Sequence, residues 1–272
     1  MPNFIHVNTK DFYIEKYSLK TPMADMHFHR ACELYFVLAG ERDYFIGNQF
    51  FKVGEGDLAV VPPDALHRTA GKGATRFLIY FTPEYLERCF TKSICDLLIS
   101  PLKATVFHPS TEFRTRMMEL MSSLLREYEW NQKERTTERD SKIALLLSDL
   151  LRLIAQLPNT VEQKENADPR GEQIVKYINE NYNEISSVEE VANHFFMSKY
   201  YFCKLFRKNM GISLFTYINT LKIQQACSIM RGTKYSLTEI ATRCGFNTSS
   251  YFCKMFKRIM GVSPSEYRKS TI

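Results

Sequence analysis

The sequence contains one segment twice, at residues 201–213 ("YFCKLFRKNMGIS") and, fifty residues later, at 251–263 ("YFCKMFKRIMGVS"). Eight of the thirteen aligned positions are identical. Upstream of each copy lies Ser-x-x-Glu, beginning at Ser187 and at Ser236, a pattern typical of the capping box that opens a helix. Each copy therefore predicts a short helix, a tight turn and a longer helix, which is the layout of a helix-turn-helix.

The turn and the apolar face of each copy follow from single residues. Gly245 lies in the turn of the second copy, where glycine adopts a positive φ at least cost. The first copy is one residue shorter and has Phe195-Phe196 there, so its turn is less well defined by the sequence. Apolar residues recur at i, i+3 and i+4 in both longer helices and should face the core: Phe202, Leu205 and Phe206, and Phe252, Met255 and Phe256.

The number of copies favours a DNA-binding protein over a solenoid built from many repeats. A solenoid needs at least about three repeats to bury a continuous core. Two units suit two adjacent major grooves, which recur about 34 Å apart along one face of a duplex. Between the copies, residues 213–230 follow a helical period, and such a helix would be about 27 Å long. We therefore predict that the chain contacts DNA twice, with the two units braced by this helix.

The charge is concentrated in the same part of the chain. From Arg170 to the end there are nine Lys and six Arg against seven Glu, a net charge of +8, which leaves −2 for the rest. This asymmetry indicates that only the C-terminal part meets a polyanion. A basic, solvated domain without such a partner is the alternative that charge leaves open.

The segment "EIATRCGFNTSSYFCKMFKRIMGVSPSEYR" (239–268) resembles the signature of AraC-type transcription regulators, in which two helix-turn-helix units are joined by a long helix. The resemblance covers about 171–270, and it departs at Ser213-Leu214, where the second copy has Ser263-Pro264. By position it implies that DNA meets Ser198, Lys199, Tyr200, Cys203, Lys204 and Lys208 in the first unit, and Asn247, Ser249, Ser250 and Lys254 in the second. Cys203 and Cys253 are more simply explained as small side chains than as redox sensors.

The N-terminal half predicts strands and then helices. Short apolar runs at 33–40, 42–53 and 57–62, separated by Gly-containing turns, favour a barrel or sandwich. Helical spacing follows at 113–125 and 143–154, separated by the polar stretch 131–140. We expect an α+β chain with four parts: a barrel (1–108), a helical dimerisation segment (109–157), a linker (158–170) and a DNA-binding domain (171–272).

Four polar side chains of the predicted barrel should converge. His27, His29 and Glu33 share one face of an extended strand with Tyr35, and His67 follows a Pro turn later. Three imidazoles and a carboxylate suit a divalent transition metal. Polar contacts to an organic effector and a purely structural role remain alternatives.

The spacing of these residues is similar to both cupin motifs. His27-x-His29, Glu33 and Gly40 match the first motif, and Gly56, Pro62 and His67 match the second. The resemblance covers about 20–82 and implies a double-stranded β-barrel. Many AraC-type regulators carry such a barrel as their sensor, so the two resemblances support each other.

The overall prediction is a regulator of transcription and not an enzyme. We expect a cytoplasmic homodimer that binds promoter DNA and a small molecule, a sugar or another small polar metabolite, with RNA polymerase as a further candidate partner. Tyr35, Arg42 and Tyr44 would line the effector site beside the four polar residues above. The N-terminal residues show no signal peptide, no apolar run approaches the roughly 18 residues of a membrane span, and the seven Cys form no CxxC.

Activation and repression remain open, as does the identity of the effector. The rival interpretation from another class is a metal-dependent cupin enzyme, such as a dioxygenase or isomerase, fused to a DNA-binding domain. A third interpretation, an architectural DNA protein, gives the barrel no role and predicts no sequence preference.

Overall fold

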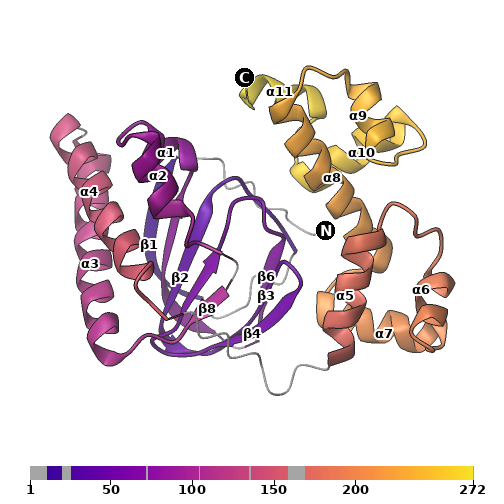
Figure 1. Cartoon of the computed structure of the whole chain (residues 1–272), viewed down its shortest axis with the longest axis horizontal. Coiled ribbons are helices and arrows are strands. Elements are labelled where there is room, and N and C mark those ends of the chain that lie inside the picture. Colours follow the sequence, from indigo (N-terminus) through magenta and orange to yellow (C-terminus); the bar gives the residue numbers. More distant parts are fainter. Residues whose placement is uncertain are drawn as a thin grey trace. The chain divides into compact units, whose positions relative to one another are not determined.

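A computed structural model describes residues 11–19, 26–71, 73–103, 105–134, 136–158 and 169–271. The chain divides into two compact units, one built mainly from residues 29–165 and the other mainly from residues 166–272 (Figure 1). The predicted linker, 158–170, lies almost entirely outside the described residues. None of the described helices is long and apolar enough to span a bilayer.

The N-terminal unit contains two antiparallel sheets. The five-stranded sheet has the order β1-β7-β2-β5-β8, and the three-stranded sheet has the order β4-β3-β6. The strands are β1 (Phe12–Leu19), β2 (Cys32–Gly40), β3 (Arg42–Ile46), β4 (Gln49–Val53), β5 (Leu58–Val61), β6 (His67–Ala70), β7 (Ala74–Phe81) and β8 (Thr105–Phe107). The predicted barrel strands are confirmed, and the run 42–53 forms two of them, β3 and β4, which pair as a hairpin around Gly47.

Alternation along the strands gives the five-stranded sheet two buried faces. On β2, Tyr35 and Val37 belong to an inner core shared with the three-stranded sheet. Leu34 and Phe36, which point the other way, belong to an outer core under the helices. The inner face is therefore the barrel interior, and it is the face that carries Glu33.

Four helices accompany the sheets: α1 (Pro83–Glu87), α2 (Lys92–Ile99), α3 (Thr111–Lys133) and α4 (Thr137–Ile154). The pair α3 and α4 lies side by side against the outer face of the five-stranded sheet (Figure 1). Met117, Met121, Leu147 and Leu151 lie in the outer core with the strand residues. Hydrophobic burial against the sheet therefore holds the pair in place.

Two features of this unit differ from the sequence-based expectation. The polar stretch 131–140 is mostly helical, because Asn131 is buried and its amide donates to Asp140 at 2.8 Å, while the Thr136 hydroxyl caps α4. In addition, α1 and α2 lie within the range predicted as barrel alone.

The C-terminal unit is helical throughout its regular elements. These are α5 (Pro169–Asn181), α6 (Val188–His194), α7 (Lys199–Met210), α8 (Leu214–Gly232), α9 (Leu237–Arg243), α10 (Ser249–Met260) and α11 (Pro264–Thr271). The pairs α6–α7 and α9–α10 are the two predicted helix-turn-helix units, and α8 joins them (Figure 1). Both α7 and α10 end at a glycine in the left-handed region, Gly211 and Gly261.

Candidate functional site: a double helix-turn-helix and a buried His/Glu cluster

The first helix of each unit begins at the predicted serine. The Ser236 hydroxyl accepts from the Glu239 amide, and the Glu239 carboxylate accepts from the Ser236 amide, which completes the capping box. In the first unit the Ser187 hydroxyl caps α6 in the same way, but the Glu190 carboxylate accepts from the amide and hydroxyl of Ser186. Side-chain hydrogen bonds thus stabilise the N-termini of both short helices.

The turns of the two units have the same backbone geometry. Gly245 has φ 69° and its counterpart Phe196 has φ 54°. The amides after them close equivalent hydrogen bonds, Met197 to the Ala192 carbonyl at 2.9 Å and Phe246 to the Ala241 carbonyl at 3.0 Å. The first turn therefore reaches the left-handed region without glycine, which the sequence did not reveal.

The second helices, α7 and α10, bury matching faces. Phe202 and Phe206 are buried on α7, and Phe252, Met255 and Phe256 are buried on α10, as the spacing predicts. Leu205 is only half-buried. The repeated aromatic pair packs each helix onto its own unit and leaves the basic residues on the opposite side.

The residues predicted to meet DNA lie at the start and along the outer side of these helices. All are exposed except Ser249, which is half-buried; the exposed ones are Ser198, Lys199, Tyr200, Cys203, Lys204, Lys208, Asn247, Ser250 and Lys254. Ser198 also caps α7, and Lys199 forms an ion pair with Glu189. In the second unit Thr248 is the cap, and the sequence analysis did not single it out.

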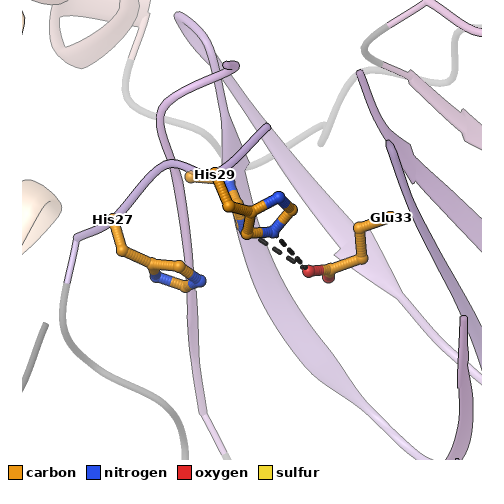
Figure 2. Close-up of side chains that lie close together, drawn as sticks. His27, His29 and Glu33 are labelled. Atoms are coloured by element: carbon orange, nitrogen blue, oxygen red, sulfur yellow. Dashed lines mark hydrogen bonds and ion pairs between the residues drawn. The ribbon is translucent and has the colours of Figure 1, made fainter. Parts of the chain in front are cut away.

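The barrel interior holds the second cluster. His29 Nε2 lies 3.3 Å from Glu33 Oε2, and His67 Nε2 lies 3.4 Å from the same oxygen. With His27 these residues offer ligand atoms that all lie within 4.8 Å of one another. Figure 2 shows the rings of His27 and His29 and the Glu33 carboxylate turned toward one another. The four residues predicted to converge do so, and all four are buried.

The backbone sets the orientation of two of the rings. His29 Nδ1 lies 2.8 Å from the Ala31 carbonyl, and His67 Nδ1 lies 2.8 Å from the Ala65 carbonyl. A carbonyl only accepts, so each Nδ1 carries a hydrogen and each Nε2 faces Glu33. Two Nε2 lone pairs facing an ionised carboxylate would repel it. A proton on each ring or a metal cation would offset this repulsion.

The carboxylate itself is held in its charged form. Burial alone would raise the pKa of Glu33, but the adjacent imidazoles of His29 and His67 hold that pKa well below its usual range. The Tyr44 hydroxyl donates to the other oxygen, Glu33 Oε1. Burial and the Glu33 charge raise the pKa of Tyr44 and of Tyr80, so both phenols keep their hydrogens. A carboxylate and three imidazoles, two of them with Nδ1 held by a carbonyl, form a donor set that fits a divalent transition metal.

The other predicted effector residues, Tyr35, Arg42 and Tyr44, are also buried on the inner face. Sequence analysis missed Arg76 and Tyr80 on the same face. Their signal was present in the period-two pattern of β7, where Arg76, Leu78 and Tyr80 alternate with residues of the outer core. The pairing of β7 with β2 shows which face points inward, because Tyr80 and Leu78 lie opposite Glu33 and Tyr35.

Comparisons with known proteins agree with both halves of this arrangement. A helix-turn-helix domain family matches residues 191–270, and a cupin domain family matches residues 14–81. The chain is 24% identical over 249 residues to an uncharacterized HTH-type transcriptional regulator of Staphylococcus aureus, covering 90% of this chain and 32% of that protein. It is 28% identical over 159 residues to the regulatory protein PocR of Salmonella typhimurium, covering 51% of this chain and 52% of PocR. The chain thus spans about a third of the first of these relatives and about half of the second.

Among solved structures, ToxT from Vibrio cholerae aligns over 96% of this chain and 98% of its own, with 14% identity and a TM-score of 0.37. The DNA-binding domain of AdpA, solved in complex with a target DNA, aligns over 36% of this chain and 88% of its own, with 31% identity and a TM-score of 0.34.

The fold and the two clusters define a class: a cupin-type barrel joined to a double helix-turn-helix unit. With the repeated helix pairs in place, the chain has the two domains that its resemblance to the AraC-type transcription regulators implies.

Proposed function

We propose that this chain regulates transcription by binding promoter DNA through α7 and α10, under the control of a ligand held in the barrel. The observation that carries the proposal is the equivalence of the two units. Lys204 and Lys254 occupy the same position of the repeat, and both are exposed on helices whose opposite faces are buried. A lysine at that position suits guanine edges and phosphates.

The length of α8 supports two contacts with one duplex. Its nineteen residues correspond to about 28 Å at 1.5 Å per residue, close to the roughly 34 Å between successive major grooves. Tyr217 and Cys227 of α8 are buried in the unit. A packed helix of this length would hold α7 and α10 at a fixed separation.

Lysine-to-alanine variants of the full chain test the DNA contacts. We expect Lys204→Ala and Lys254→Ala each to weaken specific binding by about 1–3 kcal/mol if the lysines reach base edges. If they contact phosphate alone, affinity should fall equally for all sequences and the salt slope should decrease by about one. Lys103→Ala, which removes the same charge from an exposed position of the barrel unit, is the control. Normal binding by both variants would exclude these helices from the interface.

For the barrel we propose that His27, His29, Glu33 and His67 hold a divalent transition metal. The donor set and the two carbonyl-held imidazoles support this proposal. Metal-ligating histidines commonly donate the N–H of their other ring nitrogen to a backbone carbonyl, as His29 and His67 do here. Direct polar contacts from the same residues to an organic effector are the alternative. The metal would bind the effector or hold the barrel closed around it.

The metal content of the purified protein distinguishes a metal site from direct contacts between these residues and an organic effector. We expect the purified chain to carry close to one metal ion per chain after incubation with Zn²⁺, Mn²⁺ or Fe²⁺ and gel filtration. His67→Ala should lose it, while His108→Ala, whose ring bonds Asp57 outside the cluster, should keep it. Equal metal content in all three proteins, or none in the native chain, would contradict a metal site.

The same cluster keeps a cupin enzyme fused to a DNA-binding domain as the second candidate. Metal-dependent turnover of a small molecule would favour the enzyme. A DNA affinity that changes with the ligand, without turnover, would favour the regulator.

A further inference from the structure

The barrel interior contains two buried arginines at the end away from the His/Glu cluster. Arg42 of β3 is 1% exposed and Arg76 of β7 is 3% exposed. Arg42 shares its face with Tyr44 and Ile46, and Arg76 shares its face with Leu78 and Tyr80, all residues of the inner core. Both guanidinium groups therefore belong to the interior and not to the helix-covered face.

The strand register places this end at a distance from Glu33. Glu33 is paired with Tyr80, and Val37 is paired with Arg76, four residues further along both strands. At about 3.3 Å per residue, the two levels lie roughly 13 Å apart. The interior thus has an end with a carboxylate and imidazoles and an end with two guanidinium groups.

The protein satisfies Arg76 only in part. One terminal nitrogen donates to Glu15 Oε1 at 3.1 Å. Nε and the other terminal nitrogen are buried without a hydrogen-bond partner among the described residues. Arginine keeps its charge in proteins, so the group does not escape the cost of burial by losing a proton. Buried donors without partners destabilise the folded state, and a fold that retains them benefits from a ligand that binds them.

Tyr35 of β2 lies beside Arg76 on the inner face. The Arg76 guanidinium carbon is 5.3 Å from the centre of the Tyr35 ring. The Tyr35 ring also lies 5.3 Å from the ring of Tyr44, which is two residues from Arg42 on the same face of β3. Two guanidinium groups and one hydroxyl therefore surround the same part of the interior.

We infer that Arg76, Arg42 and Tyr35 form a subsite for the acidic group of a small organic effector, a carboxylate or a phosphate. A planar guanidinium binds either anion through two parallel hydrogen bonds, and burial strengthens them. The effector thus places its acid beside Arg76 and its neutral part toward the imidazoles; a sugar acid or sugar phosphate has this polarity. The inference rests on the proposed sensing role of the barrel.

Binding of matched probes to the full chain tests the subsite. Calorimetry compares benzoate and inorganic phosphate with benzamide, the neutral counterpart of benzoate. We expect the native chain to bind at least one anion and not benzamide, and Arg76→Gln to lower that affinity at least tenfold. Arg68→Gln is the control, since Arg68 is a buried arginine of β6 that alternates with the inward-facing His67. Absence of anion binding, or equal affinity in native and Arg76→Gln chains, would overturn the inference.

The stability of ligand-free protein provides a second readout. If Arg76 serves a ligand, Arg76→Met should leave the melting temperature unchanged or raise it, and should abolish the shift caused by the anion. A strong decrease in the melting temperature without ligand would instead assign Arg76 a structural role and contradict the subsite. DNA binding by the same variants separates the two claims. A native chain that fails to bind DNA refutes the regulator, whereas failure with anions alone refutes only the subsite.

Discussion

Phe196 is the residue whose conformation is least expected from its type. It adopts φ 54° at the turn of the first unit, and its side chain is 99% exposed, so no packing offsets the backbone cost. Non-glycine residues in this region cost roughly 1–2 kcal/mol. Gly245 meets the same requirement in the second unit without that cost.

Introducing glycine at Phe196 and removing glycine at Gly245 should therefore have opposite effects on stability. We expect Phe196→Gly to raise the free energy of unfolding of the C-terminal unit by about 1 kcal/mol, and Gly245→Ala to lower it by at least about 1 kcal/mol. An added Cβ at Gly245 would also lie 3.1 Å from Lys222 Nζ and 3.3 Å from Asn183 Oδ1. Hydrogen exchange of amides in α5–α11 during urea titration of the full chain measures both changes. Shifts of the same sign would show that the turn does not limit stability.

At the scale of elements, the helical pair α3–α4 covers the five-stranded sheet, a role that the sequence analysis did not assign to it. We predicted that this segment forms a dimer, yet most of its apolar residues lie in the chain's own outer core, including Met117, Met121, Leu147 and Leu151. Leu145 on α4 and Met118 on α3 remain exposed. We keep the dimer as a proposal, now limited to the outer side of the pair.

Substitutions at two leucines of α4 distinguish a loss of folding stability from a loss of dimerisation. Leu147→Ala should cost about 2–5 kcal/mol of stability, because its side chain is fully buried in the outer core. Leu145, which is 58% exposed, should tolerate glutamate in the folded monomer.

Association itself is measured by light scattering at micromolar concentration. We expect a native dimer that Leu145→Glu weakens at least tenfold, while Leu97→Glu, at a leucine of α2 that is 70% exposed, leaves it intact. A native monomer, with and without DNA, would contradict the proposed interface.

Local patterns explain what the sequence could and could not predict about these elements. Helix caps and 3.6-residue spacing placed α6–α10, because these patterns act between near neighbours. The convergence of His29 and Glu33 was predicted, but not its cause: β2 begins at Cys32, and His27 and His29 lie on the segment before it, which bends at Arg30 and Ala31, and not on one extended strand. The pairing of β2 with β7 joins residues that lie far apart in the sequence, and no local pattern encodes it. For that reason Arg76 was missed. Burial of α3 and α4 against the sheet depends on the same long-range assembly.

At the scale of the whole molecule, one chain carries two kinds of binding site. The barrel offers a cluster of imidazoles and a carboxylate and, further along, two arginines. The C-terminal unit offers two equivalent basic helices joined by α8. A regulator requires both, since ligand binding has a consequence only if it changes the affinity for DNA by a coupling free energy.

The most direct test of the central claim is selection of duplexes by the full chain from a random library at fixed salt. Binding through α7 and α10 predicts an enriched site with two recognised segments whose centres lie about 10–10.5 base pairs apart. Lys204→Ala should relax the sequence requirement in one segment and Lys254→Ala in the other. No enriched sequence, or equal affinity for the selected and the scrambled duplex at the same salt, would contradict sequence-specific binding by this chain.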